Sequence, residues 1–262
     1  MDIHSSVAGL KFNAPTAKWI SANGFATSKD RLVYLEGVAR QRDMQNAVQF
    51  LQRVRRLSAV DTYLSSFVEG IHNYVKQDGK LHVSLLQHRT ATGRLSGANP
   101  NMQNMPRGGT FPVKRVFVSR FNGGKILEGD YSQLEFRVAG FLAGDKQVLQ
   151  DVKDEVDVHS YTASIIGVSR QEAKAHTFKP LYGGKTGTTS EVRYYEAFLE
   201  KYKGIEEWHQ RLGREALVRK KITLPSGREY QFPNVKSYAN GGYSNATQIK
   251  NYPVQGFATA DI

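Results

Sequence analysis

The stretch RQEAKAHTFKPLYGG, residues 170–184, places two cations and then two aromatic side chains at intervals of four residues, and ends in a glycine pair. The four side chains are Arg170, Lys174, Phe178 and Tyr182. A step of four residues along an α-helix drifts by only about 40°, so all four would project from roughly one side. This mixed stripe predicts a ligand with an anionic end and a flat end, such as a nucleotide.

Each part of the stripe also has an ordinary structural explanation. The cations could lie along a solvated helix face with their charged ends in water, and the aromatic rings could pack in a core. Pro180 lies inside the stripe and cannot donate a hydrogen bond to the carbonyl of His176, so we expect a local kink or a 3₁₀ turn there.

The composition favours an anionic partner. The 262 residues include 36 Lys and Arg against 24 Asp and Glu, a formal net charge of +12. Such an excess suits nucleic-acid phosphates, although a basic globular protein without that partner is the alternative. The absence of cysteine excludes disulfides and thiolate metal sites. No apolar run approaches the ~18 residues of a membrane span and the N-terminus lacks a signal-peptide pattern, so we expect a cytoplasmic protein with no membrane partner.

Periodicity and turn residues predict an α+β chain. Helices are expected at 43–76, with a basic outer face, at 133–144 and over most of 145–221. A long loop is expected at 89–109, and loops of this length are usually functional. Strands are expected at 81–87, 115–119 and 125–132, a hairpin at 222–232 about Ser226 and Gly227, and a last helix within 241–262 that stops in mid-pattern.

Asp130 follows the apolar run KIL at the point where a helix is expected to start. A carboxylate at a strand end can hold a hard cation such as Mg²⁺, but Asp130 could equally cap the helix. Glu135 would lie on that helix near the same carboxylate, or it could be an ordinary surface glutamate. His159, after Asp157, could be a ligand or could lie in the first turn of a helix capped by that aspartate.

Taken together, four segments resemble family A DNA polymerases, the DNA polymerase I type, and phage members especially. They occur in the family's order: TATGRLSGANPNMQNMP at 90–106, DYSQLEFR at 130–137, RQEAKAHTFKPLYG at 170–183 and NYPVQGFATADI at 251–262. The resemblance implies a right-hand polymerase fold with mostly helical fingers. Its expected divisions are a partial thumb at 1–79, palm at 80–144, fingers at 145–251 and the start of a returning palm segment at 252–262.

In this family the aspartate that matches Asp130 binds both Mg²⁺ ions of a two-metal phosphoryl transfer. Tyr131 would offer its backbone carbonyl to one metal. Glu135 would crowd the sugar 2′ position and exclude ribonucleotides, and Gln133 would be a further nucleotide-binding residue. The implied cofactor is therefore Mg²⁺, with two ions in the complete enzyme.

The resemblance also assigns the opening stripe to a fingers helix that closes over an incoming deoxynucleoside triphosphate. Arg170 and Lys174 would bind the β- and γ-phosphates, Lys174 with a catalytic role, and His159 would add a hydrogen-bond donor. Phe178 would pack on the sugar and base, and Tyr182 would stack at the template position.

Primer–template DNA is the other implied partner. The side chains that match the family's minor-groove contacts are Arg94, Asn104, Asn251 and Gln255, and the basic helices at 43–76 would bind duplex phosphates. Minor-groove acceptors occupy nearly the same place in every correct base pair, so such contacts read shape without sequence. Thr247 stands where many members carry an arginine, and Lys250 could replace that contact.

The family's second metal-binding aspartate lies in a His-Asp-Glu hairpin beyond the segment that ends at Ile262. We therefore expect a truncated or split polymerase that is inactive alone and that pairs with a complementing C-terminal fragment, in the host cytoplasm if a phage encodes it. One alternative is a single-subunit RNA polymerase, against which Glu135 argues. The other is a catalytically inactive DNA-binding half of a split polymerase.

Overall fold

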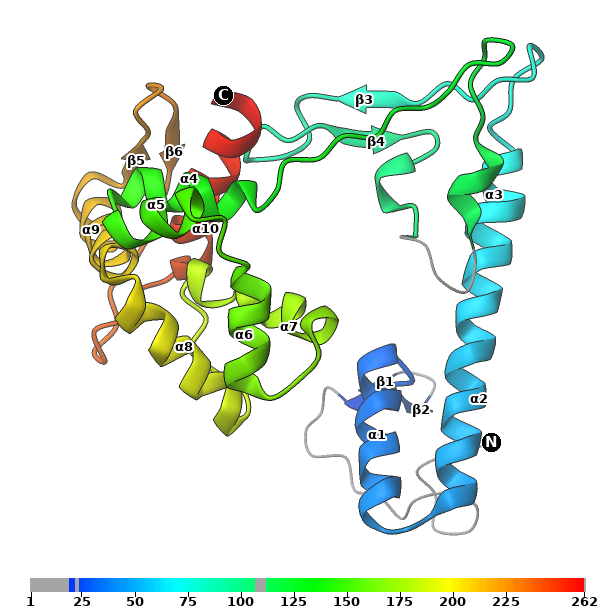
Figure 1. Cartoon of the computed structure of the whole chain (residues 1–262), viewed down its shortest axis with the longest axis horizontal. Helices are drawn as coiled ribbons and strands as arrows, with labels where there is room; N and C mark the ends of the chain where they lie inside the picture. The colour runs from blue at the N-terminus through cyan, green and yellow to red at the C-terminus, as the bar shows by residue number, and fades with distance from the viewer. Residues whose placement is uncertain (1–18, 22–23, 107–111, 262) are drawn as a thin grey trace. The chain divides into compact units, whose positions relative to one another are not determined.

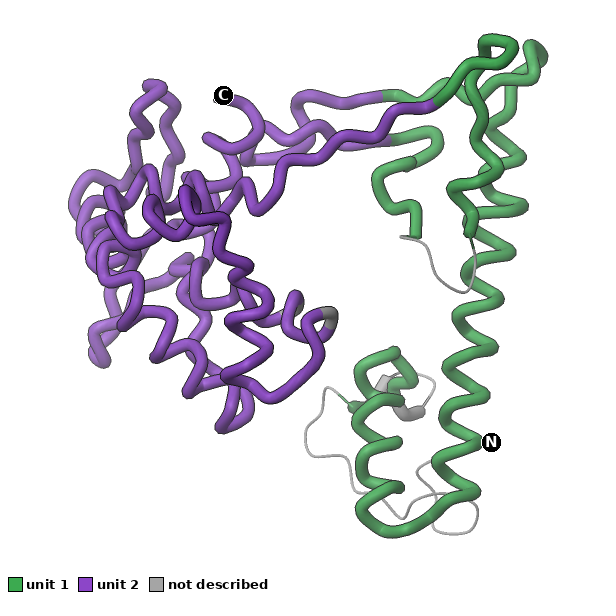
Figure 2. The backbone as a smooth tube through the Cα atoms, in the orientation of Figure 1, with its two compact units in different colours: residues 1–84, 98–125 green, residues 85–97, 126–262 purple. Residues whose placement is uncertain are grey.

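Two units, each assembled from two separated stretches of chain, make up the computed structural model (Figure 1, Figure 2). The structure describes residues 19–21, 24–106 and 112–261. The first unit comprises residues 1–84 and 98–125, and the second comprises residues 85–97 and 126–262.

The first unit is built on a pair of helices, α1 (Lys29–Gln41) and α2 (Gln45–Thr62). A π-helix, η2 (Tyr63–Glu69), and a short turn of helix, α3 (Gly70–His72), continue α2. The short strands β1 (Ile20–Ser21) and β2 (Gly24–Phe25) pair antiparallel before α1. Apolar side chains at steps of three and four form the stripe by which the helices pack. The buried cluster comprises Trp19, Leu32, Leu35, Ala39, Val48 and Leu51.

A buried carboxylate fastens the two helices together. Glu36 of α1 is 8% exposed and accepts hydrogen bonds from Arg40 at 2.8 Å, from Gln52 at 2.9 Å and from Arg55 at 2.6 Å. The bonds from Arg40 and Gln52 lower the pKa of Glu36 against the opposing effect of burial. Because the glutamine and one arginine belong to α2, the charge that α1 buries is neutralised and hydrogen-bonded by its neighbour.

The strands expected at 115–119 and 125–132 are not formed, and this prediction is wrong. Residues Val113–Val116 form a 3₁₀ helix, η4, and no strand lies between residues 117 and 132. A strand needs a neighbour for its backbone N–H and C=O groups, and no described segment pairs with these residues. Their apolar side chains accordingly face solvent, with Leu127 97% exposed.

The predicted strand at 81–87 is present but shorter. It is β3 (Ser84–Leu86), which pairs with β4 (Ser96–Ala98). Two of the three boundaries between the units fall within these strands, and the third lies between residues 125 and 126. The loop expected at 89–109 is interrupted by β4 and by one 3₁₀ helix, η3 (Met102–Asn104), and its residues 107–109 lie outside the described residues.

The second unit is mostly helical and matches the helical pattern expected over 133–144 and 145–221. Polar side chains start several of its helices, as N-cap residues commonly do. Asp145 and Asp157 cap α5 and α6, and capping boxes begin at Ser169 for α7 and at Thr188 for α8. The helices are α4 (Leu134–Ala143), α5 (Lys146–Lys153), α6 (Val158–Ile166), α7 (Arg170–Thr177), α8 (Thr189–Lys201), α9 (Lys203–Arg219) and α10 (Ala246–Gly256).

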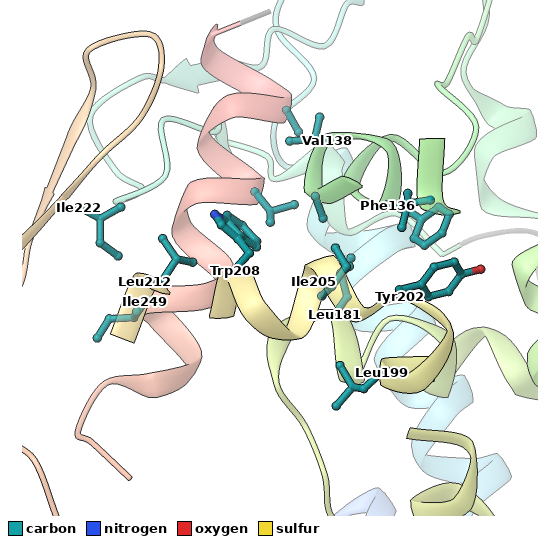
Figure 3. Packing of buried hydrophobic residues seen from close by; sticks show 14 of the residues in the cluster. Phe136, Val138, Leu181, Leu199, Tyr202, Ile205, Trp208, Leu212, Ile222 and Ile249 are labelled. Carbon is teal, nitrogen blue, oxygen red and sulfur yellow. The ribbon is translucent and has the colours of Figure 1, made fainter. Parts of the chain in front are cut away.

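Aromatic and aliphatic side chains from most of these helices share one core (Figure 3). Phe136 of α4 meets Tyr202 edge to face at 5.3 Å between ring centroids, and Tyr202 meets Phe198 at 4.7 Å. Such aromatic pairs contribute beyond the area that they bury. The Tyr202 hydroxyl donates to Asp151 at 2.7 Å, so this deep ring keeps a partner for its polar atom.

Three further sequence predictions are confirmed. The hairpin pairs β5 (Lys221–Thr223) with β6 (Glu229–Gln231), and Gly227 takes the left-handed conformation in its turn at φ 85°. A 3₁₀ turn, η5 (Pro180–Tyr182), follows α7, which ends at Thr177. The last helix, α10, runs into a π-helix, η6 (Phe257–Asp261). Within the described ranges, no helix combines the length and the apolar character that crossing a membrane requires.

Candidate nucleotide-binding site

The centre of the site is the carboxylate of Glu135, in the first turn of α4. One oxygen accepts a hydrogen bond from the Arg94 guanidinium and the other accepts one from the Tyr182 hydroxyl. Arg94 comes from the loop between β3 and β4 and Tyr182 from η5, 41 and 47 residues away in sequence. Three distant segments of the second unit therefore meet at one side chain.

Both donors to Glu135 are partly withdrawn from water. Burial, reinforced by the bond to Glu135, raises the pKa of Tyr182 well above its usual range, so the phenol stays a neutral donor. The Nε atom of Arg94 is buried without a hydrogen-bond partner among the described residues. The site thus holds one unused donor beside its central ion pair.

The cations of the stripe lie on α7. Arg170 and Lys174 are both exposed, and Arg170 forms a two-pronged ion pair with Asp157, with Nε to Oδ2 at 2.6 Å and Nη2 to Oδ1 at 3.3 Å. Asp157 also caps α6 by accepting from the backbone N–H of His159 at 3.1 Å. The Arg170 bond, ahead of the cap bonds, lowers the pKa of Asp157 far below its usual range.

His159 lies between these charges. Its Nδ1 is 3.0 Å from the Thr177 hydroxyl, and its ring meets Phe178 edge to face at 5.3 Å. Burial lowers the pKa of His159, the charges of Arg170 and Lys174 lower it further, and Asp157 opposes them. Phe178 therefore contacts the His159 ring, and both cations lie close enough to act on its charge.

The aromatic half of the stripe does not continue the helix. Because Pro180 has no N–H to donate, α7 stops at Thr177, Phe178 is its C-cap and Tyr182 lies in η5. The break expected at Pro180 therefore divides the stripe, with Arg170 and Lys174 on α7 and Tyr182 on the following 3₁₀ turn. Phe178 is half-buried and stacks on Phe136 at 6.4 Å, so one face of its ring belongs to the core.

Asp130 does not belong to this group of side chains at α6 and α7. It is exposed, lies in a stretch without regular structure, and has no partner within the described residues. The alternative in which Asp130 caps the helix is wrong, because the N-cap of α4 is Gln133, in the left-handed region, and no side chain caps this helix. Tyr131 is 77% exposed. Across the described chain, no group of three acidic or histidine side chains could hold a metal ion.

The predicted DNA contacts lie on three segments, the first of which is the loop between β3 and β4 that carries Arg94. Asn104 ends η3 in the first unit, while Asn251 and Gln255 are one helical turn apart on α10 and both half-buried. Thr247 is exposed one turn before Asn251. The side chain of Lys250 lies against the end of η5 instead. Its Nζ is so close to Gly183 that a Cβ atom at this glycine would be only 2.3 Å from it. Burial lowers the pKa of Lys250.

Sequence reasoning missed one buried group at the site. His209 of α9 is 6% exposed, and its Nε2 is 2.9 Å from the Leu181 carbonyl, to which it donates, in the turn that carries Tyr182. Burial, with a contribution from the Lys250 charge, lowers the pKa of His209 to about 4. The sequence signal is a lone histidine among apolar positions of a helix, a pattern that by itself indicates only core packing.

The comparisons with known proteins agree on one family. The model for "DNA polymerase family A" matches residues 6–262. The DNA polymerase I of Lactococcus lactis subsp. lactis is 28% identical over 286 residues, which cover 98% of this chain and 32% of the relative. The thermostable DNA polymerase I of Thermus filiformis is 31% identical over 237 residues, covering 82% of this chain and 28% of the relative.

A solved structure gives the same result for the fold. The POL domain of Pol1 from M. smegmatis, in complex with DNA primer-template and dNTP, matches 94% of this chain and 46% of its own chain with a TM-score of 0.65 at 24% identity. The predicted mostly helical α+β polymerase fold is thereby confirmed. The chain spans about a third of the length of the curated relatives that it matches. On the match over residues 6–262, this chain belongs to DNA polymerase family A.

Proposed function

We propose that this chain carries the nucleotide-adding site of a DNA polymerase, which adds deoxynucleotides to a primer 3′-OH under the direction of a template. One observation carries the proposal: Arg170, Lys174, His159 and Phe178 lie together at α6 and α7. The same unit holds the carboxylate of Glu135, which could discriminate between deoxyribose and ribose. In this account the thumb, palm and fingers correspond to the expected divisions at residues 1–79, 80–144 and 145–251.

The triphosphate would lie against α7. Lys174 is exposed, and Arg170 has further N–H groups besides the two that Asp157 uses. Fixed cations that face the charge developing on the departing pyrophosphate stabilise the transition state more than the ground state. Closure of the turn that carries Tyr182 would bring the base and sugar against Phe178.

Glu135 would select the sugar. Its carboxylate is fixed from two sides by Arg94 and Tyr182, so it cannot easily swing away from a 2′-hydroxyl. A ribonucleotide would have to displace one of these donors and leave it unsatisfied, which is costly at a partly buried site. This is why DNA synthesis is favoured over the RNA polymerase alternative.

Two of the residues present could serve as ligands of a magnesium ion. Asp130 offers a free carboxylate and Tyr131 a backbone carbonyl, the oxygen ligands that Mg²⁺ prefers. Magnesium ions, when bound, lower the pKa of the primer 3′-OH and neutralise charge on the phosphates. One carboxylate does not satisfy two divalent ions, and no group of three acidic or histidine side chains that could hold a metal ion is present in the described ranges. We therefore propose that a carboxylate-bearing segment of a longer or split polymerase completes the site.

Primer–template DNA would contact both units. The net charge of +12 supplies affinity for phosphates by counterion release. Arg94, Asn104, Asn251 and Gln255 are the proposed minor-groove contacts, and Gln133, beside Asp130, would contact the nucleotide.

A primer-extension assay tests the proposal. The 262-residue chain should bind primer–template DNA with an affinity that falls as salt rises, but should not extend the primer. A chimaera that adds the family's His-Asp-Glu segment after Ile262 should extend it with Mg²⁺, and Asp130→Ala should abolish this activity. If the chain alone synthesises DNA and Asp130→Ala leaves that synthesis intact, the metal assignment is wrong.

Sugar selection gives a second prediction, measured in the same chimaera. Glu135→Ala should raise the ribonucleotide-to-deoxynucleotide ratio of kcat/KM by about 10- to 100-fold, since the side chain that blocks the 2′-hydroxyl is gone. Glu196→Ala, on the exposed face of α8, is the matched control and should leave the ratio unchanged. An unchanged ratio in Glu135→Ala would place the sugar gate elsewhere.

The third prediction concerns the cations of α7. Lys174→Ala should reduce kcat/KM for deoxynucleotides by the equivalent of about 2–4 kcal/mol, because a fixed charge facing the leaving group is lost. Lys153→Ala removes an exposed lysine at the end of α5 and should have no such effect. Single-turnover kinetics separates binding from chemistry, and equal losses in both variants would show that Lys174 acts only through net charge.

A further inference from the structure

A chain of hydroxyl groups runs from His159 into the interface between α6 and α7. Nδ1 of His159 lies 3.0 Å from Oγ1 of Thr177, and that oxygen lies 3.0 Å from Oγ1 of Thr162 and 2.9 Å from the Ala173 carbonyl. Oγ1 of Thr162 lies 2.7 Å from the Val158 carbonyl. Both threonines are fully buried, so water cannot replace a missing partner.

The direction of this chain follows from its acceptors. Each hydroxyl has one hydrogen to donate, whereas the carbonyls can only accept. If Thr162 donates to Val158 and Thr177 donates inward, to Thr162 or to Ala173, the lone pair of Thr177 is left to accept from His159. The reverse arrangement would use the Thr177 hydrogen on Nδ1 and deprive the inner acceptors of it. The arrangement with the most hydrogen bonds therefore places the proton of neutral His159 on Nδ1.

The other ring nitrogen then carries a lone pair. Nε2 of His159 has no hydrogen-bond partner among the described residues. The charged groups around the ring are Asp157 at the start of its own helix, and Arg170 and Lys174 of α7. Tyr194 of α8 donates to the Thr177 carbonyl at 2.9 Å, and its hydroxyl oxygen can also accept from Thr162. Thr162 therefore has a second acceptor besides the Val158 carbonyl, and Thr177 is still left to donate inward. A phosphate oxygen held by the two cations would face the Nε2 lone pair when His159 is neutral. It would meet a hydrogen-bond donor there only when Nε2 is protonated.

We propose that Thr177 is a positioning residue that fixes the Nδ1–H tautomer of His159, so that binding of a nucleoside triphosphate takes up one proton at Nε2. The inference rests on the proposed function, because it requires the triphosphate to lie against α7. It adds that the hydroxyl of Thr177 makes nucleotide affinity depend on pH.

The sign of the effect follows from linkage. In the free protein, burial and the two cations lower the pKa of His159, so its ring is mostly neutral at neutral pH. A triphosphate stabilises the protonated ring and raises this pKa. Affinity is then greatest below the pKa of the free protein and is lost as pH rises through the pKa of the complex, by up to about tenfold per pH unit.

Nitrogen-15 NMR of the histidine rings in the full chain tests the tautomer without any nucleotide. His159→Gln identifies the His159 signals by their loss. The neutral ring should show N–H at Nδ1 in the wild type and in Thr177→Ser, which keeps the hydroxyl, and a shift toward Nε2–H in Thr177→Val. An Nε2–H ring in the wild type overturns the inference and leaves the proposed function intact.

Titration with dATP and Mg²⁺ at several pH values tests the linkage. The apparent Kd of the wild type and of Thr177→Ser should rise with pH more steeply than that of His159→Gln, which reports the titration of the nucleotide itself. Thr177→Val should lose most of this excess slope, because its neutral ring can donate from Nε2. A wild-type slope equal to that of His159→Gln overturns the proton uptake, and failure of dATP to perturb His159 or the α7 signals overturns the proposed function with it.

Discussion

The carboxylate of Glu135 joins three segments that the chain separates widely. Its two oxygens accept from Arg94 and Tyr182, which belong to the loop between β3 and β4 and to the turn after α7. A partly buried carboxylate with two donors is stable where it lies, but each donor that loses it becomes a desolvated polar group without a partner. The bond from Tyr182 ties the turn after α7 to α4, in addition to the bond from His209 to the Leu181 carbonyl.

The charges of the site divide into two sets. On α6 and α7, Asp157 holds Arg170 and leaves Lys174 free, so the positive charge that would meet a triphosphate is partly compensated in the absence of ligand. At α4 the acidic groups are Glu135, which is fully engaged, and Asp130, which has no partner in the described part of the chain. In the proposed function, the engaged carboxylate of Glu135 would select the sugar and the exposed carboxylate of Asp130 would bind a metal ion.

Local signals in the sequence were sufficient for much of the fold. The caps at Asp157 and Ser169 and the turn at Gly227 follow from residue chemistry within a few positions, and Pro180 ends α7 for the same kind of reason. The strand expected at 125–132 is not formed, because an apolar pattern alone does not make a strand. A strand also needs a neighbour for its backbone hydrogen bonds, and no described segment supplies one. The family resemblance identified Glu135, Arg94 and Tyr182 as candidates, but it did not predict that Glu135 accepts a hydrogen bond from each of the other two. These contacts are 41 and 47 residues apart, and local spacing does not reveal them.

The central claim, that Glu135 couples the turn after α7 to α4, is tested most directly by a double-mutant cycle. Trp19→Phe leaves Trp208, buried in the second unit, as the only tryptophan and hence the reporter of that unit's unfolding. In this background, denaturant unfolding of Glu135→Ala, of Tyr182→Phe and of the double variant gives the coupling free energy. The account predicts a coupling of about 1–2 kcal/mol, with the first substitution removing most of the effect of the second. Effects that add within about 0.5 kcal/mol would contradict it.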